Sequence, residues 1–179
     1  MAYASKYGST RGIADYLAGE FVQRGLQARA LPAQAIDDLS NYDAVVIGSA
    51  VFAGRWRPDA KAFVLRLHAE LIQRPVWLFS SGPLGTEKTD AAGNDLAAAS
   101  APLDQTNLLE LTQARGSTVF FGALDAAKLD FGGRLVRRIP AARGVMPEGD
   151  FRDWAAIEEW ADVIVTELTG LAGHVPPSS

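Results

Sequence analysis

The segment YASKYGST, residues 3–10, leads from the first apolar residues of the chain through hydroxyl side chains and one glycine directly into a helical pattern. Apolar side chains then recur every fourth residue from Ile13 to Phe21, and Gly25 follows where a helix is expected to stop. A strand that turns at once into a helix presents hydroxyls and backbone N–H groups at the positive end of the helix dipole. The segment therefore predicts an anion site, with N-capping of the helix by Ser9 or Thr10 as the alternative.

Apolar strands and amphipathic helices alternate along the rest of the chain. Further strands are predicted at residues 26–31, 44–48, 76–79 and 118–121, and further helices at 58–71, 104–114 and 153–168. Most of these strands are unbroken apolar runs, which are typical of strands covered on both faces. The pattern predicts an α/β fold with a doubly wound, five-stranded parallel sheet in the order 2-1-3-4-5 and helices on both faces.

The composition favours one soluble globular domain. The 179 residues are 48% hydrophobic and 21% charged, which supplies enough apolar side chains for one full core. Residues 1–169 are expected to form that domain, and residues 170–179, rich in Gly, Pro and Ser, a flexible tail. Residues 82–102 are too long for a plain connection, so we expect a lid or binding loop there, with disorder as the alternative.

Charge and residue usage exclude several classes of function. A net charge of −4 argues against a nucleic-acid binder, which needs a basic surface. The absence of cysteine excludes disulfides, thiol catalysis and iron–sulfur ligation. His68 and His174 are too far apart in sequence to suggest a metal site, and His68 is expected to be a partly buried helix residue. We expect a cytoplasmic location, because no apolar run approaches the roughly 18 residues of a membrane span and no signal peptide opens the chain.

Loops that follow three of the predicted strands meet at one edge of such a sheet, where doubly wound proteins bind ligands. Residues 5–10 supply the anion site, and residues 49–54 place Phe52 on a loop of small residues, where an aromatic side chain can cover a planar ring. Trp56 is expected instead to pack against neighbouring helices. Residues 80–82 add hydroxyls and exposed backbone. A phosphate site, an aromatic cover and a polar rim together predict a mononucleotide with a large flat ring, which describes FMN.

Four segments of the chain carry a resemblance to a known family. They are SKYGSTRGIADYLA, YDAVVIGSAVFAG, FFGALDAAKLDFGGRLVRRI and DFRDWAAIEEWADVI, and the likeness runs from Tyr3 to about Thr169. The segments resemble the flavodoxin-like superfamily, and more specifically the flavodoxin-domain proteins related to menaquinone-dependent protoporphyrinogen dehydrogenase. That family usually has several apolar residues before the position of Tyr3, whereas this chain has Met1 and Ala2, so the central strand is expected to be very short.

The resemblance implies which residues would bind FMN. The phosphate would be held by Ser5, Tyr7, Gly8, Ser9 and Thr10, the isoalloxazine ring would be bordered by Ser49, Ala50, Val51, Phe52, Ala53 and Gly54, and the other side would be closed by Ser80, Ser81 and Gly82. No catalytic side chain is named, because N5 of a flavin itself accepts and returns electrons or hydride.

The activity that the resemblance implies is an FMN-dependent oxidoreductase that passes two electrons to a quinone, with a porphyrinogen as the substrate. One alternative is a soluble FMN electron carrier or small quinone reductase without a porphyrin role. Another is a doubly wound regulatory module that binds no flavin, although a phosphoacceptor module would want an aspartate where Ser49 stands.

Two groups of basic residues add to this prediction. Arg55 and Arg57 follow the ring loop, where positive charge would stabilise the reduced anionic flavin; the alternative is that both face solvent. A second group comprises Lys128, Arg134, Arg137, Arg138 and Arg143. If residues 131–139 are helical, this segment is basic and amphipathic and could contact the inner face of an anionic membrane or the carboxylates of a substrate. A solvated helix face is the alternative.

Overall fold

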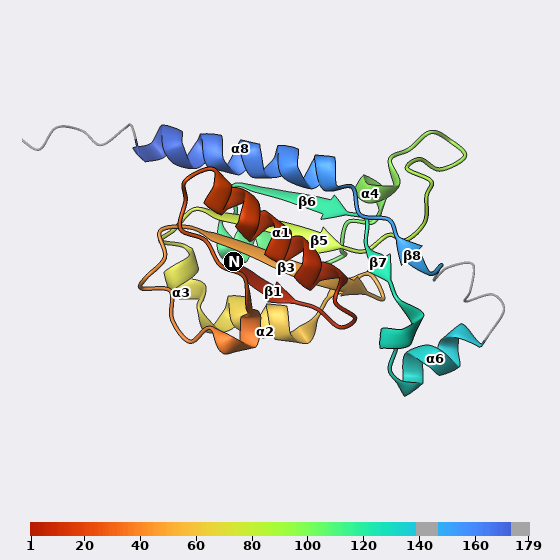
Figure 1. The fold of residues 1–179 in the computed structure, drawn as a ribbon. Helices are drawn as coiled ribbons and strands as arrows, with labels where there is room; N and C mark the ends of the chain where they lie inside the picture. The colour runs from red at the N-terminus through yellow and green to blue at the C-terminus, as the bar shows by residue number, and fades with distance from the viewer. Residues whose placement is uncertain (139–146, 173–179) are drawn as a thin grey trace, which may run out of the picture.

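Strands and helices alternate along the chain, as the apolar pattern predicts (Figure 1). The structure is a computed structural model that describes residues 1–138 and 147–172; of residues 136, 137, 171 and 172 it describes the backbone alone. The strands are β1 (Ala2–Ala4), β2 (Leu31–Pro32), β3 (Val45–Phe52), β4 (Arg55–Trp56), β5 (Val76–Ser81), β6 (Gly116–Phe120), β7 (Ala123–Leu124) and β8 (Gly149–Asp150). The helices are α1 (Ser9–Gln23), α2 (Pro58–Arg66), α3 (His68–Leu71), α4 (Leu96–Ala99), α5 (Gln105–Thr112), α6 (Phe131–Arg137) and α8 (Trp154–Ala172), with 3₁₀ turns η1 (Ala33–Ala35) and η2 (Ala126–Lys128).

The main sheet is doubly wound. Within the described residues its five parallel strands lie in the order β2-β1-β3-β5-β6, which is the predicted order 2-1-3-4-5, and β4 adds an antiparallel pairing to β3. The predicted fold class is therefore confirmed. The carboxyl ends of β3, β5 and β6 point to one edge of the sheet, and β7, β8 and α6 lie beyond that edge (Figure 1).

Helices cover both faces of the sheet with apolar side chains. On one face, Ile13 and Leu17 of α1 and Ile157 and Ile164 of α8 belong to one buried cluster. On the other face, the helices α2, α3 and α5 supply the buried side chains Phe63, Val64, Leu71 and Leu108. Each large apolar side chain buried in this way stabilises the fold by about 1.5–3 kcal/mol. The two layers hold the strands in register, so the loops at their carboxyl ends have fixed starting points.

Helix α1 ends where the sequence predicts. Gly25 adopts a φ of 87°, its N–H donates to the carbonyl of Val22 at 3.0 Å, and the N–H of Leu26 donates to the carbonyl of Phe21 at 3.0 Å. These two bonds form the Schellman motif, which requires a left-handed residue that glycine adopts without strain. The motif turns the chain back towards the sheet.

The second strand is much shorter than predicted. Of the predicted stretch 26–31, only Leu31 belongs to β2, and β2 pairs with β1 through Ala2 and Tyr3. The reason is the length of its neighbour: β1 has three residues, as its sequence predicts, so most of 26–31 has no strand to pair with. Met1 makes the contacts that extend furthest back: its carbonyl accepts from the Leu31 N–H at 2.9 Å, and its amino group donates to the carbonyl of Arg29 at 2.7 Å.

Two further predictions differ in detail from the structure. The predicted helix 58–71 is interrupted at Leu67, whose φ of −107° and ψ of 20° separate α2 from α3. His68 then begins α3, is half-buried as expected, and its Nδ1 lies 2.7 Å from the carbonyl oxygen of Leu111. Helix α8 continues to Ala172, into the stretch expected to be a tail, and residues 173–179 lie outside the described residues.

The loop at 82–102 has structure of its own. The Asp90 carboxylate accepts hydrogen bonds from the backbone N–H groups of Ala92 and Asn94, both at 2.8 Å. Asp95 caps α4 by accepting from the N–H of Ala97 at 2.7 Å. These local bonds are the ones that Asp side chains typically make in turns and at helix starts, so part of this segment folds as a compact unit.

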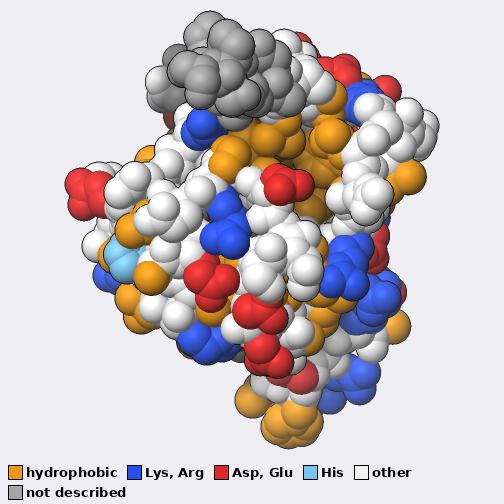
Figure 2. Space-filling model, turned by 90° about the vertical axis from the view of Figure 1, so that its left-hand side faces the viewer, with side chains coloured by type: hydrophobic (Ala, Val, Ile, Leu, Met, Phe, Trp, Pro, Cys, Tyr) orange, Lys and Arg blue, Asp and Glu red, His pale blue; other side chains and the backbone are white. Residues whose placement is uncertain are grey.

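Figure 2 shows the end of the molecule that lies at the amino ends of the strands, opposite the ligand edge. Side chains of Lys and Arg are interspersed there with those of Asp and Glu, in keeping with a net charge of −4. The described part of this face carries no broad basic field of the kind that a nucleic-acid backbone binds. Within the described residues, no helix is long and apolar enough to cross a membrane.

Candidate functional site

A cavity of about 660 Å³ lies at the carboxyl edge of the sheet, between the loops that follow β1, β3 and β5. Of the residues predicted to bind FMN, all except Gly8, Ser49 and Ser80 line it. The structure thus brings together three segments that are far apart in sequence. Whether these residues bind a ligand stays a prediction, which the geometry below supports in part.

The loop between β1 and α1 leaves the start of the helix open. Gly8 is the N-cap residue, with a left-handed φ of 95°, and its N–H donates to Ser5 Oγ at 3.1 Å. Among the described residues, no side chain caps the helix, so the alternative that Ser9 or Thr10 serves as the N-cap is wrong. The first N–H groups of a helix have no intrahelical acceptor and carry its positive partial charge. They are available to an anion in the cavity.

The hydroxyls of this loop have different roles. Ser9 Oγ accepts from the backbone N–H of Ala123 at 2.9 Å and lies 3.1 Å from Ser81 Oγ, so it joins the first helix to two other loops of the cavity. Thr10 is fully buried and lines the cavity, and its Oγ1 has no hydrogen-bond partner within the described residues. A buried hydroxyl without a partner costs about 1–3 kcal/mol, so this atom is available to a hydrogen-bond acceptor in the cavity.

The loop after β3 is a tight hairpin to β4. Ala53 and Gly54 both have positive φ, 49° and 70°, and Phe52 pairs with Arg55, which defines a two-residue turn of the type I′ geometry. Phe52 is 41% exposed and lines the cavity, and its ring meets the Tyr7 ring edge-on at 6.1 Å. The predicted aromatic cover therefore lies beside the predicted anion loop.

The segment that precedes α5 forms hydrogen bonds with this hairpin. The N–H of Leu103 donates to the carbonyl of Gly54 at 2.8 Å. The carboxylate of Asp104, almost wholly buried, accepts from the N–H of Trp56 at 3.3 Å and from Lys61 Nζ at 3.1 Å. The hairpin is thereby fixed to α2 and to the start of α5, and we call Leu103 and Asp104 the hairpin clamp.

Two predicted serines face the interior of the fold instead of the cavity. Ser49 is fully buried and its Oγ accepts from the N–H of Arg57 at 3.0 Å. Ser80 is also buried and accepts from Trp56 Nε1 at 2.8 Å. The structure therefore places both serines where they bond the β3–β4 region to the sheet, and it confirms that Trp56 packs in the core.

The charged residue at the cavity is one that sequence reasoning did not single out. Neither Arg55 nor Arg57 is among the described residues that line the cavity, and Arg57 pairs with Asp59 at 3.0 Å. Lys6 is the charged side chain in the described lining, and its Nζ lies 2.8 Å from Asp130 Oδ2. Lys6 belongs to the segment 3–10, so the sequence could have indicated a charge at the cavity. Its partner Asp130 lies more than a hundred residues away and could not be predicted.

Another wall of the cavity was also missed. It is formed by the small and apolar residues Pro83, Leu84, Ala99, Ser100, Ala101, Leu103, Gly122, Ala123 and Leu124. Several of these belong to the segment 82–102 for which the sequence predicts a lid or binding loop, and the structure brings that segment to the cavity. Within the described residues, no group of three or more histidines and carboxylates could hold a metal ion.

This arrangement defines a class of protein: a doubly wound α/β domain with a cavity at the switch of strand order, bounded by the open start of α1 and by the β3–β4 hairpin that carries Phe52. Residues 1–141 match the Flavodoxin domain family. The chain belongs to that family.

Comparison with curated proteins finds distant relatives. The chain is similar to protoporphyrinogen IX dehydrogenase [quinone] of Escherichia coli strain K12, with 32% identity over 82 residues. The match covers 45% of this chain and 45% of the relative, so it spans less than half the length of either protein. The predicted resemblance is confirmed as a distant and partial one.

Solved structures share the fold. Flavodoxin 1 from Bacillus cereus, in its oxidised form, matches with a TM-score of 0.56 and 14% identity over 98% of this chain and 97% of that one. Rubredoxin oxygen:oxidoreductase from Desulfovibrio gigas matches with a TM-score of 0.59 and 16% identity over 94% of this chain and 35% of that one. At these identities the likeness concerns the fold alone.

Proposed function

We propose that the protein binds FMN in the 660 Å³ cavity and acts as an oxidoreductase that transfers two electrons to a quinone. The observation that carries the proposal is Thr10 Oγ1, a buried hydroxyl that lies at an open helix start and has no partner among the described residues. A phosphate at this position would accept from the hydroxyl and from the first N–H groups of α1.

The residues present fit the cofactor. Ser5, Tyr7 and Thr10 would hold the phosphate end, while Phe52 on its hairpin and Ser81 on the loop after β5 would border the ring. The cavity volume lies within the range of cofactor sites, and its wall of small apolar side chains suits a planar aromatic group.

Bound FMN supplies the redox chemistry itself, because its ring accepts and returns electrons at N5. The task of the chain is to bind, orient and shield. The open start of α1 fixes one end of the ligand, the hairpin clamp holds Phe52 in place, and the segment after Gly82 keeps water away from one side of the cavity. We assign no proton donor to a side chain.

The partial similarity to a protoporphyrinogen IX dehydrogenase [quinone] supports a quinone as acceptor and a porphyrinogen as donor. The second candidate is an FMN electron carrier or small quinone reductase without a porphyrin role. It is supported by the likeness to a flavodoxin along nearly the whole of both chains.

The first experiment is an absorbance spectrum of the purified protein, followed by release and mass analysis of its chromophore and by titration of the stripped protein with FMN. We expect a flavin spectrum and saturable binding of FMN. A colourless protein that ignores added FMN would contradict the proposal and favour a flavin-free regulatory module.

The second experiment separates the two candidates by their electron donor. The holoprotein is mixed anaerobically with protoporphyrinogen or with NAD(P)H, and the loss of flavin absorbance is followed. Rapid reduction by protoporphyrinogen supports the first candidate, whereas reduction by NAD(P)H alone supports the second.

The proposal includes contact of α6 with an anionic membrane surface, where a quinone would be found. Phe131 is 84% exposed and Leu135 54% exposed, and the side chains of Arg134 and Arg138 are exposed as well. The side chain of Arg137 and all of Arg143, which belong to the same predicted basic group, lie outside the described residues. The apolar and basic side chains of a short exposed helix are those that bind lipid headgroups and the acyl boundary.

This contact is tested by co-sedimentation with vesicles of anionic or zwitterionic lipid. We expect binding to anionic vesicles that the double variant Arg134→Gln, Arg138→Gln weakens. Equal sedimentation of variant and wild type would favour a solvated helix face, the alternative role of these arginines.

A further inference from the structure

We infer that Asp130 is a positioning residue of the cavity. It holds Lys6 and Tyr7 beside the β3–β4 hairpin and offsets the Lys6 charge, and it thereby tunes the charge that a bound flavin experiences. The inference rests on the proposed FMN site. It concerns a residue outside the cavity lining, in the segment between η2 and α6.

Asp130 reaches across to the anion loop with both carboxylate oxygens. Oδ2 lies 2.8 Å from Lys6 Nζ, and Oδ1 accepts from the Tyr7 hydroxyl at 3.1 Å. Oδ1 also accepts from the N–H of Gly133 at 2.7 Å, which caps α6. A single carboxylate therefore fixes two consecutive residues of the β1–α1 loop to the start of another helix.

The fit between the two segments is close. A Cβ built on Gly133 would lie 2.8 Å from the Tyr7 hydroxyl oxygen, so the end of the Tyr7 side chain would have to shift away. Glycine at this position lets the loop and the start of α6 come together. The two segments are joined by the three contacts of the Asp130 carboxylate, with Lys6, Tyr7 and the Gly133 N–H.

Lys6, the partner of Asp130, lies close to the β3–β4 hairpin. Its ammonium lies 4.9 Å from the centre of the Tyr7 ring and 5.7 Å from the centre of the Phe52 ring. Phe52 and Lys6 both line the cavity. The ammonium thus lies over the two aromatic side chains at the cavity wall, where its charge acts on any anionic ligand inside.

Lys6 and Asp130 shift each other's pKa in the directions that favour the charged forms. The hydrogen bond from Lys6, with that from the Gly133 N–H, lowers the pKa of Asp130 from 3.8 to about 2, and Asp130 in turn raises the pKa of Lys6. Both groups are therefore charged at neutral pH, and together they add little net charge to the cavity wall. Removal of one partner leaves a single uncompensated charge of known sign.

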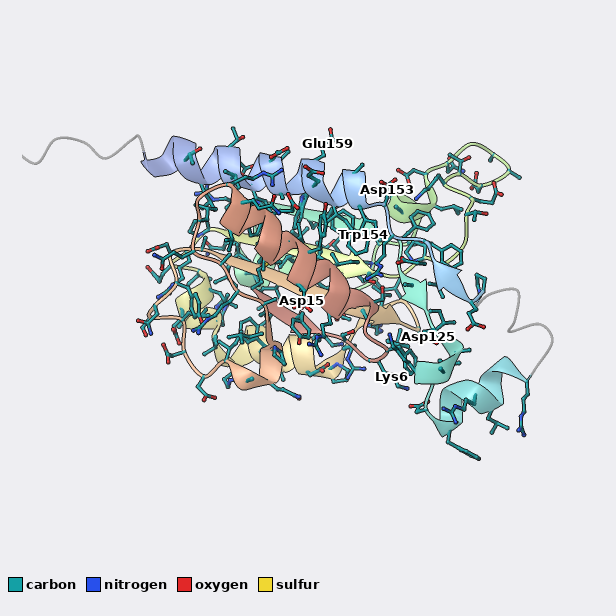
Figure 3. The ribbon with its side chains drawn as sticks, in the orientation of Figure 1. Lys6, Asp15, Asp125, Asp153, Trp154 and Glu159 are labelled. Atoms are coloured by element: carbon teal, nitrogen blue, oxygen red, sulfur yellow. The ribbon has the colours of Figure 1, made fainter. Side chains whose placement is uncertain are left out.

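The proposal is tested with three variants and one matched control. Asp130→Asn removes the negative charge but keeps an oxygen for the Gly133 N–H, since Asn is as good an N-cap as Asp. Lys6→Met removes the positive charge, and the double variant removes both. The control is Asp125→Asn, which removes a carboxylate of the same segment that pairs with Lys128 at 3.6 Å; Figure 3 labels Lys6 and Asp125 at the same end of the molecule.

The measurements are the dissociation constant of FMN and the two-electron midpoint potential of the holoprotein. We expect Asp130→Asn to bind FMN about threefold more tightly and to raise the potential, because the uncompensated Lys6 attracts the phosphate and the reduced anionic ring. Lys6→Met should bind FMN about threefold more weakly and lower the potential. The double variant should return to the wild-type values, and Asp125→Asn should change neither.

A purely structural role of Asp130 would shift both single variants in the same direction, and this result would overturn the inference. Equal values for all variants, or the same shift in Asp125→Asn as in Asp130→Asn, would overturn it too while the FMN site itself stands. Failure of the wild type to bind FMN would overturn both proposals.

Discussion

Among single residues, Thr10 is informative because its buried hydroxyl lacks a hydrogen-bond partner in the described part of the chain. Its side chain is fully buried beside the cavity, yet its hydroxyl has no acceptor or donor in the described part of the chain. Valine has the same shape without the polar atom, so the fold alone would be better served by valine. The hydroxyl is therefore expected to serve binding at the expense of stability.

Replacing Thr10 with Val should separate these two effects. We expect the free energy of unfolding of the flavin-free protein to rise by about 1 kcal/mol, because an unpaired buried hydroxyl is removed. The dissociation constant of FMN should rise about tenfold, because a charge-assisted hydrogen bond to the phosphate is lost. Urea denaturation and fluorescence titration measure the two quantities.

Thr112 offers the matched control, since it is equally buried but its Oγ1 donates to the carbonyl of Leu108 at 2.7 Å. The variant Thr112→Val should lose up to about 1 kcal/mol of stability and leave FMN binding unchanged. If Thr10→Val instead behaves like Thr112→Val, the Thr10 hydroxyl has no role in the site.

The features of single residues that could be predicted from the sequence depend on neighbours in the chain. Gly25 and the Schellman motif follow from the helical period that precedes them, and the core position of Trp56 follows from its place before α2. The bond between Trp56 and Ser80 and the pairing of Lys6 with Asp130 could not be predicted, because each joins residues whose proximity depends on the completed sheet.

At the scale of elements, the β3–β4 hairpin depends on the segment before α5. Asp104 accepts from the backbone of Trp56 and from Lys61, and the preceding peptide N–H, that of Leu103, bonds to Gly54. The turn contains Ala53 in a left-handed conformation that non-glycine residues adopt with strain. The hairpin clamp therefore offsets a strained turn at the cavity wall.

Removing the carboxylate of Asp104 should loosen this hairpin. We expect Asp104→Ala to lower the free energy of unfolding by about 1–3 kcal/mol, since the partly buried Trp56 N–H loses its acceptor, and to weaken FMN binding. Asp104→Asn retains an oxygen for the Trp56 N–H and should recover part of both losses. Chemical denaturation and FMN titration check the result, and equal behaviour of the two variants would mean that the charge, and not the hydrogen bond, matters.

The order of elements was predictable, but their lengths were less so. Apolar runs indicate which segments enter the sheet, and β3 and β5 lie where such runs occur. The strand predicted at 26–31 is much shorter in the structure because strand length depends on the neighbour, and β1 is short. The cavity wall after Gly82 was missed in detail because its residues are small and carry no chemical signature.

At the scale of the whole molecule, the first and last helices are joined by charge as well as by their apolar faces. Arg24 at the end of α1 pairs with Glu20 on its own helix and with Asp162 on α8, and it lies 3.6 Å from Glu158. The hydrogen bond from Arg24 lowers the pKa of Asp162 below its ordinary value of 3.8. Asp162 is therefore charged over nearly the whole pH range of the folded state.

This pairing predicts an acid dependence of stability. A carboxylate with a lowered pKa stabilises the folded state above the pKa of the unfolded chain, and this contribution is lost as the pH falls through the lowered value. We expect Asp162→Asn to be less stable than the wild type at pH 7, and we expect this deficit to be smaller at pH 2.5. Urea denaturation at both pH values measures the difference.

The control for this prediction is Glu167→Gln, an equal change of charge at an exposed position of the same helix. It should show a smaller difference at pH 7. A deficit of Asp162→Asn that persists undiminished at pH 2.5 would show that the effect comes from helix packing instead of the ion pair.

The three loops that enclose the cavity follow β1, β3 and β5, so each loop begins at a different strand of the sheet. Insertions, deletions or exchanges in one loop can therefore accumulate over evolutionary time without disturbing the scaffold, as long as contacts between loops such as that of Ser9 with Ser81 are kept. Relatives that share this fold can therefore differ in the ligands they bind. For this reason, membership of the family is easier to recognise from a sequence than the substrate.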